Sequence, residues 1–597
     1  MNNIKGWFKK SWFTRPFDEI SKFKKNTSKL KYLLFVYFLV VIISALMLWS
    51  PIAQNLVDPV TKVENVPLSF VDALFTASSA FSDTGLTVKA TYSQFNIFGQ
   101  FLLAILIFSG GIGIFAIKLF VFNFIFRRKN ISLSDANLVQ SERGGNDSSK
   151  VINLVIASVK FLVVITITFG FLLSIYFYYA NDNATTPGIA VYLKEQNPAL
   201  VHADHYAGFQ SPRGNWSLAF RFGFFHTVSA INNAGFDIIS NVSLMPYYND
   251  YFLQICFIIL FIIGGLGYPV LYDIYGWFKH KISKNTKPYN FTLFSKLSLI
   301  IYFLVFVVGF STSLIFETLS KDYNTIWNKY YVSDHQTNAY RLYIANNSQF
   351  VTPWKDPDGN EIAPAKLVGY QVIINNIKAN GPMYGNTFQK IFAILFISLS
   401  TRSAGFYTAL LSDFTFNSYI TYSIMMFIGA APSSTGGGIR TTTFALVILT
   451  LFATFKGDSK IRLFGRSINK DNCFNALKVF IISLFLIILA TIICVTSFDV
   501  YSKNGATTSG TLTDQSGFRN VTQNYRLEQI VFEICSAFGT TGLSLGITPV
   551  LNDGSKITLT IVMFIGQFGV SSLMFVWKRK KRYNRYYEYI EEDVAIG

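Results

Sequence analysis

Eight long apolar runs constrain the fold of this 597-residue chain more than any other feature. They fall near 31–50, 97–126, 151–180, 250–278, 294–318, 416–455, 474–498 and 556–577. Each is near or above the roughly 20 residues that cross a bilayer as a helix. Only 14% of the residues are charged, whereas a soluble globular chain carries about a quarter. The sequence therefore predicts an all-α polytopic membrane protein with eight transmembrane helices.

The positive charges of the chain lie in short segments between these runs. They cluster at 127–129, 279–287, 456–466 and 578–582 and in the N-terminal segment 1–30. If the eight spans alternate, all five clusters face one side, and the positive-inside rule makes that side cytoplasmic. Both termini are then cytoplasmic, and the polar stretches 181–215, 319–385 and 499–525 lie outside. Topology thus accounts for the net charge of +18, and we expect no nucleic-acid partner.

A short polar phrase that contains a glycine recurs four times on the predicted outer side. It reads SAFSDTGLTV at 79–88, SAINNAGFDI at 229–238, STRSAGFYTA at 400–409 and SAFGTTGLSL at 536–545. Each copy follows an apolar segment that is too short to span a bilayer. Irregular backbone at membrane depth is tolerated only against protein or a water-filled cavity. Each apolar segment is therefore predicted to be a re-entrant pore helix that ends in a loop.

The four copies align on Gly85, Gly235, Gly405 and Gly542. A small residue lies five positions before each glycine: Ala80, Ala230, Ser400 and Ala537. The chain is accordingly predicted to hold four covalent repeats of helix, pore helix with loop, and helix around one pseudo-fourfold pore. The predicted repeats cover 31–126, 151–278, 294–455 and 474–577, the third with an extracellular insertion at 319–385. A basic segment 1–30 and a C-terminal tail 578–597 are predicted to be cytoplasmic.

Four such loops around one axis can make a cation filter. Backbone carbonyls can replace the hydration shell of an alkali ion, and glycine permits the backbone angles that turn successive carbonyls to one side. The C-terminal ends of the short helices add partial negative charge. The predicted K+ selectivity filter consists of Asp83, Thr84, Gly85, Leu86, Asn233, Ala234, Gly235, Phe236, Ser403, Ala404, Gly405, Phe406, Thr540, Thr541, Gly542 and Leu543.

The sixth apolar run contains a segment that cannot form a regular helix. It reads GAAPSSTGGGIRTTTFA at 429–445, and proline and consecutive glycines both oppose helix. The span is predicted to break in the membrane, as a movable gate loop or as a kink needed only for packing. The predicted gate residues are Pro432, Ser433, Ser434, Thr435, Gly436, Gly437, Gly438 and Arg440. Arg440 has either a functional role as an intramembrane charge or an interfacial position.

These motifs resemble the Trk/Ktr/HKT superfamily of K+ transporters, most closely the membrane subunit of bacterial Ktr and Trk systems. GGIGIFAIKL at 110–119 and GGLGYPVL at 264–271 add to the resemblance. It implies K+ uptake across the cell membrane and no enzymatic activity. It also implies a homodimer and a cytoplasmic ring of nucleotide-binding, Rossmann-type RCK subunits. Glycine in all four filters implies preference for K+, and the 429–445 loop implies a gate.

The chain itself has no Walker A or GxGxxG phosphate-binding motif. Nucleotide control is therefore expected from another polypeptide, and the transported K+ is the only bound species expected here. The alternatives are a Na+-permeable or Na+-coupled cation transporter, or a secondary transporter of another solute.

Gln567, Asp83 and Arg402 place polar or charged side chains at the predicted pore. Gln567, in GQFGVSSL, stands where many relatives of that superfamily carry an arginine, and it is a pore-lining candidate. Asp83 either concentrates cations or bonds loop amides. The sequence leaves open whether Arg402 pairs with a carboxylate such as Asp83 or Asp237.

Overall fold

The computed structural model describes residues 28–59, 64–121, 148–180, 185–195, 211–283, 288–331, 364–379, 381–458, 461–505 and 526–570. These residues form helices joined by loops, with one two-stranded hairpin, β1 (Arg462–Leu463) and β2 (Arg466–Ser467). The segments 1–27 and 571–597, and with them most of both predicted cytoplasmic ends, lie outside the described residues. The basic cluster at 127–129 lies outside them as well.

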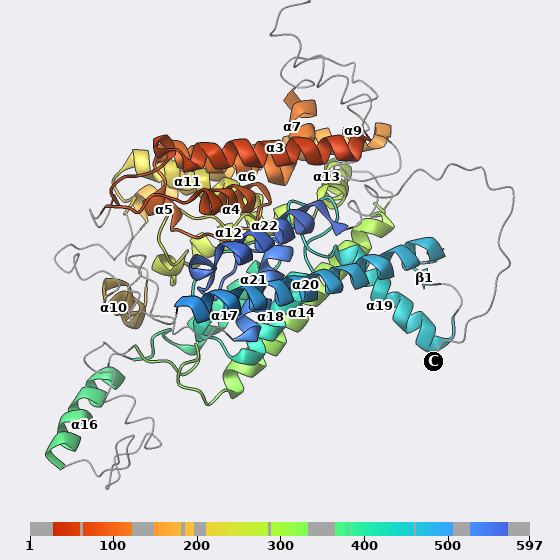
Figure 1. Cartoon of the computed structure of the whole chain (residues 1–597). Helices are drawn as coiled ribbons and strands as arrows, with labels where there is room; N and C mark the ends of the chain where they lie inside the picture. The colour runs from red at the N-terminus through yellow and green to blue at the C-terminus, as the bar shows by residue number, and fades with distance from the viewer. Residues whose placement is uncertain are drawn as a thin grey trace, which may run out of the picture.

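Long helices make the outside of the molecule. They are α3 (Lys29–Trp49), α9 (Ser148–Tyr179), α14 (Leu293–Leu319) and α20 (Lys470–Gly505). In the described part of the chain, these four contain the helices that are long and apolar enough to cross a membrane unaided. In Figure 1, α3 and α20 run across the view, and the shorter α4 (Phe70–Phe81), α21 (Leu527–Phe538) and α22 (Asp553–Phe568) lie between them.

The four predicted pore helices are all present as short helices. They are α4, α11 (Trp216–Ile231), α17 (Thr387–Ser400) and α21. Three of them begin at a side-chain cap, because Ser69, Asn215 and Asn386 each accept a hydrogen bond from the backbone N–H three residues on. Such caps satisfy N–H groups that have no partner within the helix. The predicted filter loop follows each helix directly.

The same packing recurs around these short helices. Each long helix packs on the short helix that follows it: α3 on α4, α9 on α11, α14 on α17 and α20 on α21. The helix that follows each predicted filter loop is called the inner helix here. Each inner helix contacts the short helix of the next predicted repeat: α6 (Ile97–Ile112) with α11, α12 (Tyr251–Gly265) with α17, α18 (Phe416–Phe427) with α21, and α22 with α4. The last contact closes the cycle on the first short helix.

The inner spans are not the continuous helices that the apolar runs predicted. The run 97–126 breaks at Gly113 into α6 and α7 (Ile114–Phe120), which meet at 89°, and the run 250–278 breaks at Gly267 into α12 and α13 (Tyr268–Ile282), at 108°. The run predicted at 556–577 has its helix end at Phe568, before Gly569. All three glycines have φ between +82° and +90°, a conformation that ends a right-handed helix.

Two further predictions change in detail. The run 416–455 forms two helices, α18 and α19 (Thr441–Lys456), separated by the predicted break. The stretches predicted to lie outside contain helices as well, α10 (Pro187–Glu195) and α16 (Pro364–Ala379), and α16 lies away from the helical body in Figure 1. The remaining short elements are α5 (Thr91–Gln94) and 3-10 turns at 51–53, 245–247, 411–413 and 548–550.

Two buried carboxylates hold helix N-termini in the same way. Asp273 of α13 accepts hydrogen bonds from the backbone and hydroxyl of Thr292 and from the hydroxyl of Ser295, at the start of α14. Glu317 near the end of α14 accepts the equivalent bonds from Thr415 and Ser418, at the start of α18. Negative charge at a helix N-terminus is stabilising, so α13, α14 and α18 are tied in series.

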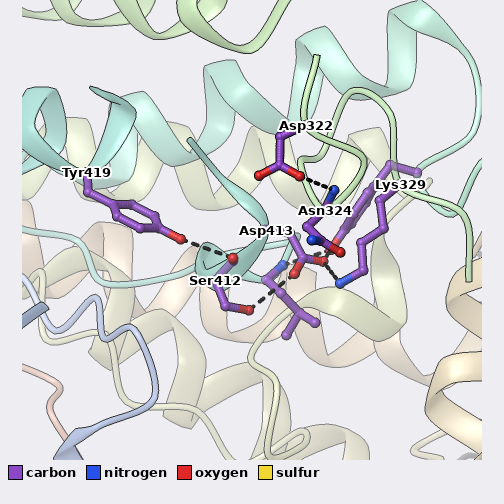
Figure 2. Close-up of polar contacts among 8 residues, drawn as sticks. Asp322, Asn324, Lys329, Ser412, Asp413 and Tyr419 are labelled. Carbon is purple, nitrogen blue, oxygen red and sulfur yellow. Dashed lines mark hydrogen bonds and ion pairs between the residues drawn. The ribbon is translucent and has the colours of Figure 1, made fainter. Parts of the chain in front are cut away.

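A buried ion pair fixes the segment that follows the third filter loop. Lys329 Nζ lies 2.6 Å from Asp413 Oδ2, with 11% and 4% of the two side chains exposed. Figure 2 shows this pair together with the bond from the Tyr419 hydroxyl to the Ser412 carbonyl. Tyr384 donates its hydroxyl to Asp413 as well, at 2.7 Å. These contacts attach residues 322–331 to the 3-10 turn at 411–413, which follows the third predicted filter loop.

Lys329→Met should lower the free energy of unfolding by roughly 3 kcal/mol, because it leaves the Asp413 carboxylate buried without its cation. Lys321→Met, at an exposed position of the same segment, is the matched control. The measurement is the thermal unfolding of the purified protein in detergent. Equal midpoints for the two variants would contradict this role of the ion pair.

Candidate functional site

The four aligned glycines lie next to one another in a closed ring. A Cβ placed on Gly85 would lie 3.0 Å from the Cα of Gly235, and one placed on Gly235 would lie 2.9 Å from the Cα of Gly405. A Cβ on Gly405 would meet the Thr541 carbonyl oxygen, and one on Gly542 would lie 2.9 Å from the Cα of Gly85. Because real Cβ atoms do not approach other atoms so closely, only glycine fits at these four positions.

The backbone conformation is the same in all four loops. Each glycine has a positive φ, between +67° and +88°. The residue two positions earlier also has a positive φ, although it carries a side chain: Asp83, Asn233, Ser403 and Thr540. Non-glycine residues rarely adopt this conformation. Two left-handed residues separated by one other residue give each loop the same turn.

The predicted filter residues therefore come together as four short strips of backbone: 83–86, 233–236, 403–406 and 540–543. They follow the C-terminal ends of α4, α11, α17 and α21, and nearly all of them are buried. In each strip the N–H before the glycine bonds back to a serine carbonyl, as in Thr84 to Ser79 at 2.8 Å. The strips are thus anchored to their own helices.

The two sides of the glycine ring differ. On one side lies a cavity of about 80 Å³, lined by the four glycines and by the residues two positions after them: Thr87, Asp237, Tyr407 and Ser544. On the other side lies the non-helical segment 428–440. A Cβ placed on Gly436 would lie 2.6 Å from the Ser403 Cβ, and one on Gly437 would lie 2.5 Å from the Thr540 Cγ2.

The segment 428–440 confirms the predicted helix break, since α18 ends at Phe427 and α19 begins at Thr441. The predicted gate residues 432–438 all lie in it. It bonds to the break between α12 and α13, because Ala431 donates to the Gly265 carbonyl at 3.1 Å and Tyr268 donates to the Ser433 carbonyl at 3.1 Å. It also bonds to the fourth strip, where the Gly437 N–H donates to the Thr540 hydroxyl at 2.7 Å.

The sequence left open whether Arg402 pairs with Asp83 or Asp237, and among the described residues it makes no ion pair with either. Its guanidinium is fully buried and donates to three carbonyl oxygens at the broken end of α18: Met425 at 3.2 Å, Gly429 at 2.7 Å, and Ile428. It also stacks over the Tyr302 ring, 4.9 Å from the centroid. Carbonyls at a helix C-terminus have no partner within the helix, and Arg402 supplies their donors.

Gln567 connects the first predicted filter strip with the predicted gate segment. Its side-chain amide donates to Asp83 Oδ2 at 3.1 Å and to the Thr435 carbonyl at 3.0 Å. Arg440 lies beside it and donates to the Gln567 carbonyl at 3.1 Å and to the Gly436 carbonyl. Gln567 therefore holds Thr435 near Asp83, and the half-buried Arg440 bonds to backbone carbonyls of the same region.

Sequence reasoning missed two side chains that support the strips. His226 of α11 and Glu533 of α21 both lie nine residues before their glycine. His226 Nε2 accepts the Ile238 N–H at 3.2 Å, and Glu533 accepts the Leu545 N–H at 3.0 Å and the Ser544 hydroxyl at 2.6 Å. Both N–H groups lie three residues after their glycine. The equal spacing of the polar side chain from its glycine in the two repeats is the sequence signal from which this role could have been predicted.

Comparison with known proteins places this arrangement in a family. The model of the TrkH family, described as cation transport protein, matches residues 4–585. The chain is 32% identical to the uncharacterized cation transporter MG322 of Mycoplasma genitalium, over 94% of this chain and 96% of that protein. It is 30% identical to the Ktr system potassium uptake protein D of Bacillus subtilis, over 94% and 95%.

Among solved structures, the potassium transporter TrkH from Vibrio parahaemolyticus is similar in fold, with a TM-score of 0.50 and 13% identity over 92% of this chain and 85% of that chain. The proteins to which this chain is similar are named as transporters, and the chain is accordingly a transporter and not an enzyme. The chain belongs to the TrkH family, within the Trk/Ktr superfamily of membrane subunits.

Arg402→Met should destabilise the protein strongly, because each buried carbonyl that loses its donor costs about 1–3 kcal/mol. Arg402→Lys keeps a cation with fewer donors and should lie between the methionine variant and wild type. Arg466→Met, at an exposed position, is the control. Thermal unfolding in detergent gives the order, and a methionine variant as stable as wild type would refute the capping role of Arg402.

Proposed function

We propose that the protein takes up K+ across the cell membrane through a selective pore around the glycine ring. The observation that carries this proposal is the mutual approach of Gly85, Gly235, Gly405 and Gly542. Backbone that is packed this closely leaves carbonyl oxygens as the groups available to a passing ion. Such oxygens can replace the hydration shell of K+, and the C-terminal ends of four short helices favour a cation.

In this proposal the sixteen filter residues belong to four covalent repeats around a pseudo-fourfold pore with eight spans. The cyclic contacts of α4, α11, α17 and α21 with the inner helix of the preceding unit support it. The two bent helix pairs and the α18–α19 pair each count as one broken span. K+ is the transported ion, and the chain needs no bound nucleotide.

We further propose that the non-helical part of the predicted gate loop 429–445, residues 429–440, gates this pore; residues 441–445 begin α19. It lies directly against Ser403 and Thr540 of two filter strips, and its glycines keep it from forming helix. Hydrogen bonds with Gln567, Arg440, Thr540 and the break between α12 and α13 hold it in the position that the structure shows. A partner that binds a second position of this segment more tightly, by a few kcal/mol, would shift the population to that position.

The partners proposed for the chain are a second copy of itself and a cytoplasmic ring of nucleotide-binding RCK-type subunits. The relative in Bacillus subtilis is named as part of a Ktr system, which supports a multi-subunit assembly. The basic clusters support an orientation with both termini in the cytoplasm of a cell-membrane protein. The regulatory ring would then bind near Lys456 and Arg462, where α19 ends.

A Na+-permeable or Na+-coupled transporter is the second candidate. A relative from Enterococcus hirae, 27% identical over 88% of this chain, is named potassium/sodium uptake protein NtpJ. Uptake of Rb+ into liposomes that contain the purified protein, with Na+ and K+ as competitors, distinguishes the two. Competition by K+ alone supports the K+ pore, and equal competition by Na+ supports the alternative.

Gly85→Ser should weaken the preference for K+ over Na+ by roughly fivefold, about 1 kcal/mol of discrimination. The serine side chain would meet the Ala234 carbonyl oxygen and move a filter strip. Gly214→Ser is the matched control, since Gly214 also has a positive φ, +71°, but no atom within 4 Å of its added Cβ. Both variants carry similar backbone strain, so unchanged selectivity in a folded Gly85→Ser protein would count against the filter.

Deletion of residues 435–438 should raise K+ flux and remove its dependence on the nucleotide of the partner ring. The deletion removes the part of the segment that packs against Ser403 and Thr540. The measurement is Rb+ flux with and without the regulatory ring. A deletion variant that folds and dimerises, yet keeps wild-type nucleotide-controlled flux, would leave the glycines as a packing kink.

A further inference from the structure

A cavity lies on the side of the glycine ring away from the segment 428–440, and its lining includes charged side chains that are not part of the proposed filter. Its volume of about 80 Å³ holds several water-sized particles, since about 10–15 Å³ of such space holds one water. The four glycines form part of its lining, so an ion in the cavity lies directly next to the ring. In the proposed orientation this is the outer entrance.

One acid and one base are present among the described residues that line the cavity, Asp237 and Lys89. Asp237 lies two positions after Gly235, and the equivalent positions after the other three glycines hold the uncharged Thr87, Tyr407 and Ser544. The carboxylate therefore breaks the fourfold similarity at the mouth of the ring. Lys89 opposes its charge from the first strip's loop.

The Asp237 carboxylate is held in place rather than free to swing out. Its Oδ1 accepts the Ser240 N–H at 3.3 Å, and the Ile239 N–H donates to the carboxylate as well. Burial raises the pKa of Asp237 to about 7, although these two N–H bonds lower it. A carboxyl with this pKa changes its charge in the ordinary range of external pH.

Two tyrosines complete the electrostatic surroundings of Asp237. Burial and the Asp237 charge raise the pKa of Tyr407, with a smaller effect of Tyr192. Burial, Asp58 and Asp237 raise the pKa of Tyr92 in α5. Both phenols thus stay neutral near pH 7. Among Asp237 and these two tyrosines, the carboxyl of Asp237 is then the group that changes charge near neutral pH.

We propose that the cavity is an outer cation site, in which the Asp237 carboxylate binds a partly hydrated monovalent cation before the cation enters the glycine ring. Protons compete with the cation for this carboxylate. This inference rests on the proposed pore. The ionised carboxylate attracts K+, and the protonated carboxyl does not. Apparent affinity for external K+ is therefore full at pH above the pKa and falls as external pH drops through it.

The test is Rb+ uptake by cells that lack their own K+ uptake and express the full chain, at external pH of about 6 and about 8. Asp237→Asn should raise the KM for Rb+ roughly three- to tenfold at the higher pH, as expected for the loss of one charge at close range. It should also remove the difference in KM between the two pH values. Lys89→Gln should change the KM in the opposite direction.

Asp322→Asn is the control, because Asp322 is an exposed carboxylate that does not line the cavity, and its KM should match wild type at both pH values. Wild-type KM and pH dependence in Asp237→Asn would overturn the outer site. If that variant is not produced, Lys89→Gln decides, and an unchanged or raised KM would overturn it. If the wild-type chain gives these cells no Rb+ uptake, that result would instead contradict the proposed pore itself.

Discussion

The close approach of four backbone segments at Gly85, Gly235, Gly405 and Gly542 is the constraint on which the rest of the structure depends. No side chain fits there, so the ring must be made of glycine and surrounded by helices that bring the backbones together. Four short helices end at it, and each inner helix packs against the next short helix. Glycines of the inner helices follow the same rule: a Cβ on Gly264 or Gly566 would meet the carbonyl oxygen of Ile231 or Phe538, next to the end of a short helix.

Irregular backbone in the interior must find hydrogen-bond partners within the protein. Arg402 supplies donors to the broken end of α18, and His226 and Glu533 accept N–H groups from the residues that follow two of the strips. These three side chains are buried and polar, yet each serves backbone groups. This role explains why these ionisable residues occur in short helices that are otherwise apolar.

Much of this could be predicted from the sequence, because apolar length and glycine-containing phrases are local signals. The short helices, the break at 428–440 and the strips 83–86, 233–236, 403–406 and 540–543 were found in this way. The bends at Gly113 and Gly267 were not, because one glycine in an apolar run does not distinguish a tolerated helical residue from a break. The partners of Arg402 and Gln567 depend on contacts between segments far apart in the chain, which spacing alone does not provide.

The most direct test of the central claim is to locate the ion. Crystals of the protein grown with Rb+ or Tl+ give an anomalous scattering signal from those cations. We expect a peak on the axis between the four glycine strips, within coordination distance of their carbonyl oxygens. A well-ordered structure with the glycine ring intact and no peak on that axis would contradict the filter, and with it the proposed route of K+ through the protein.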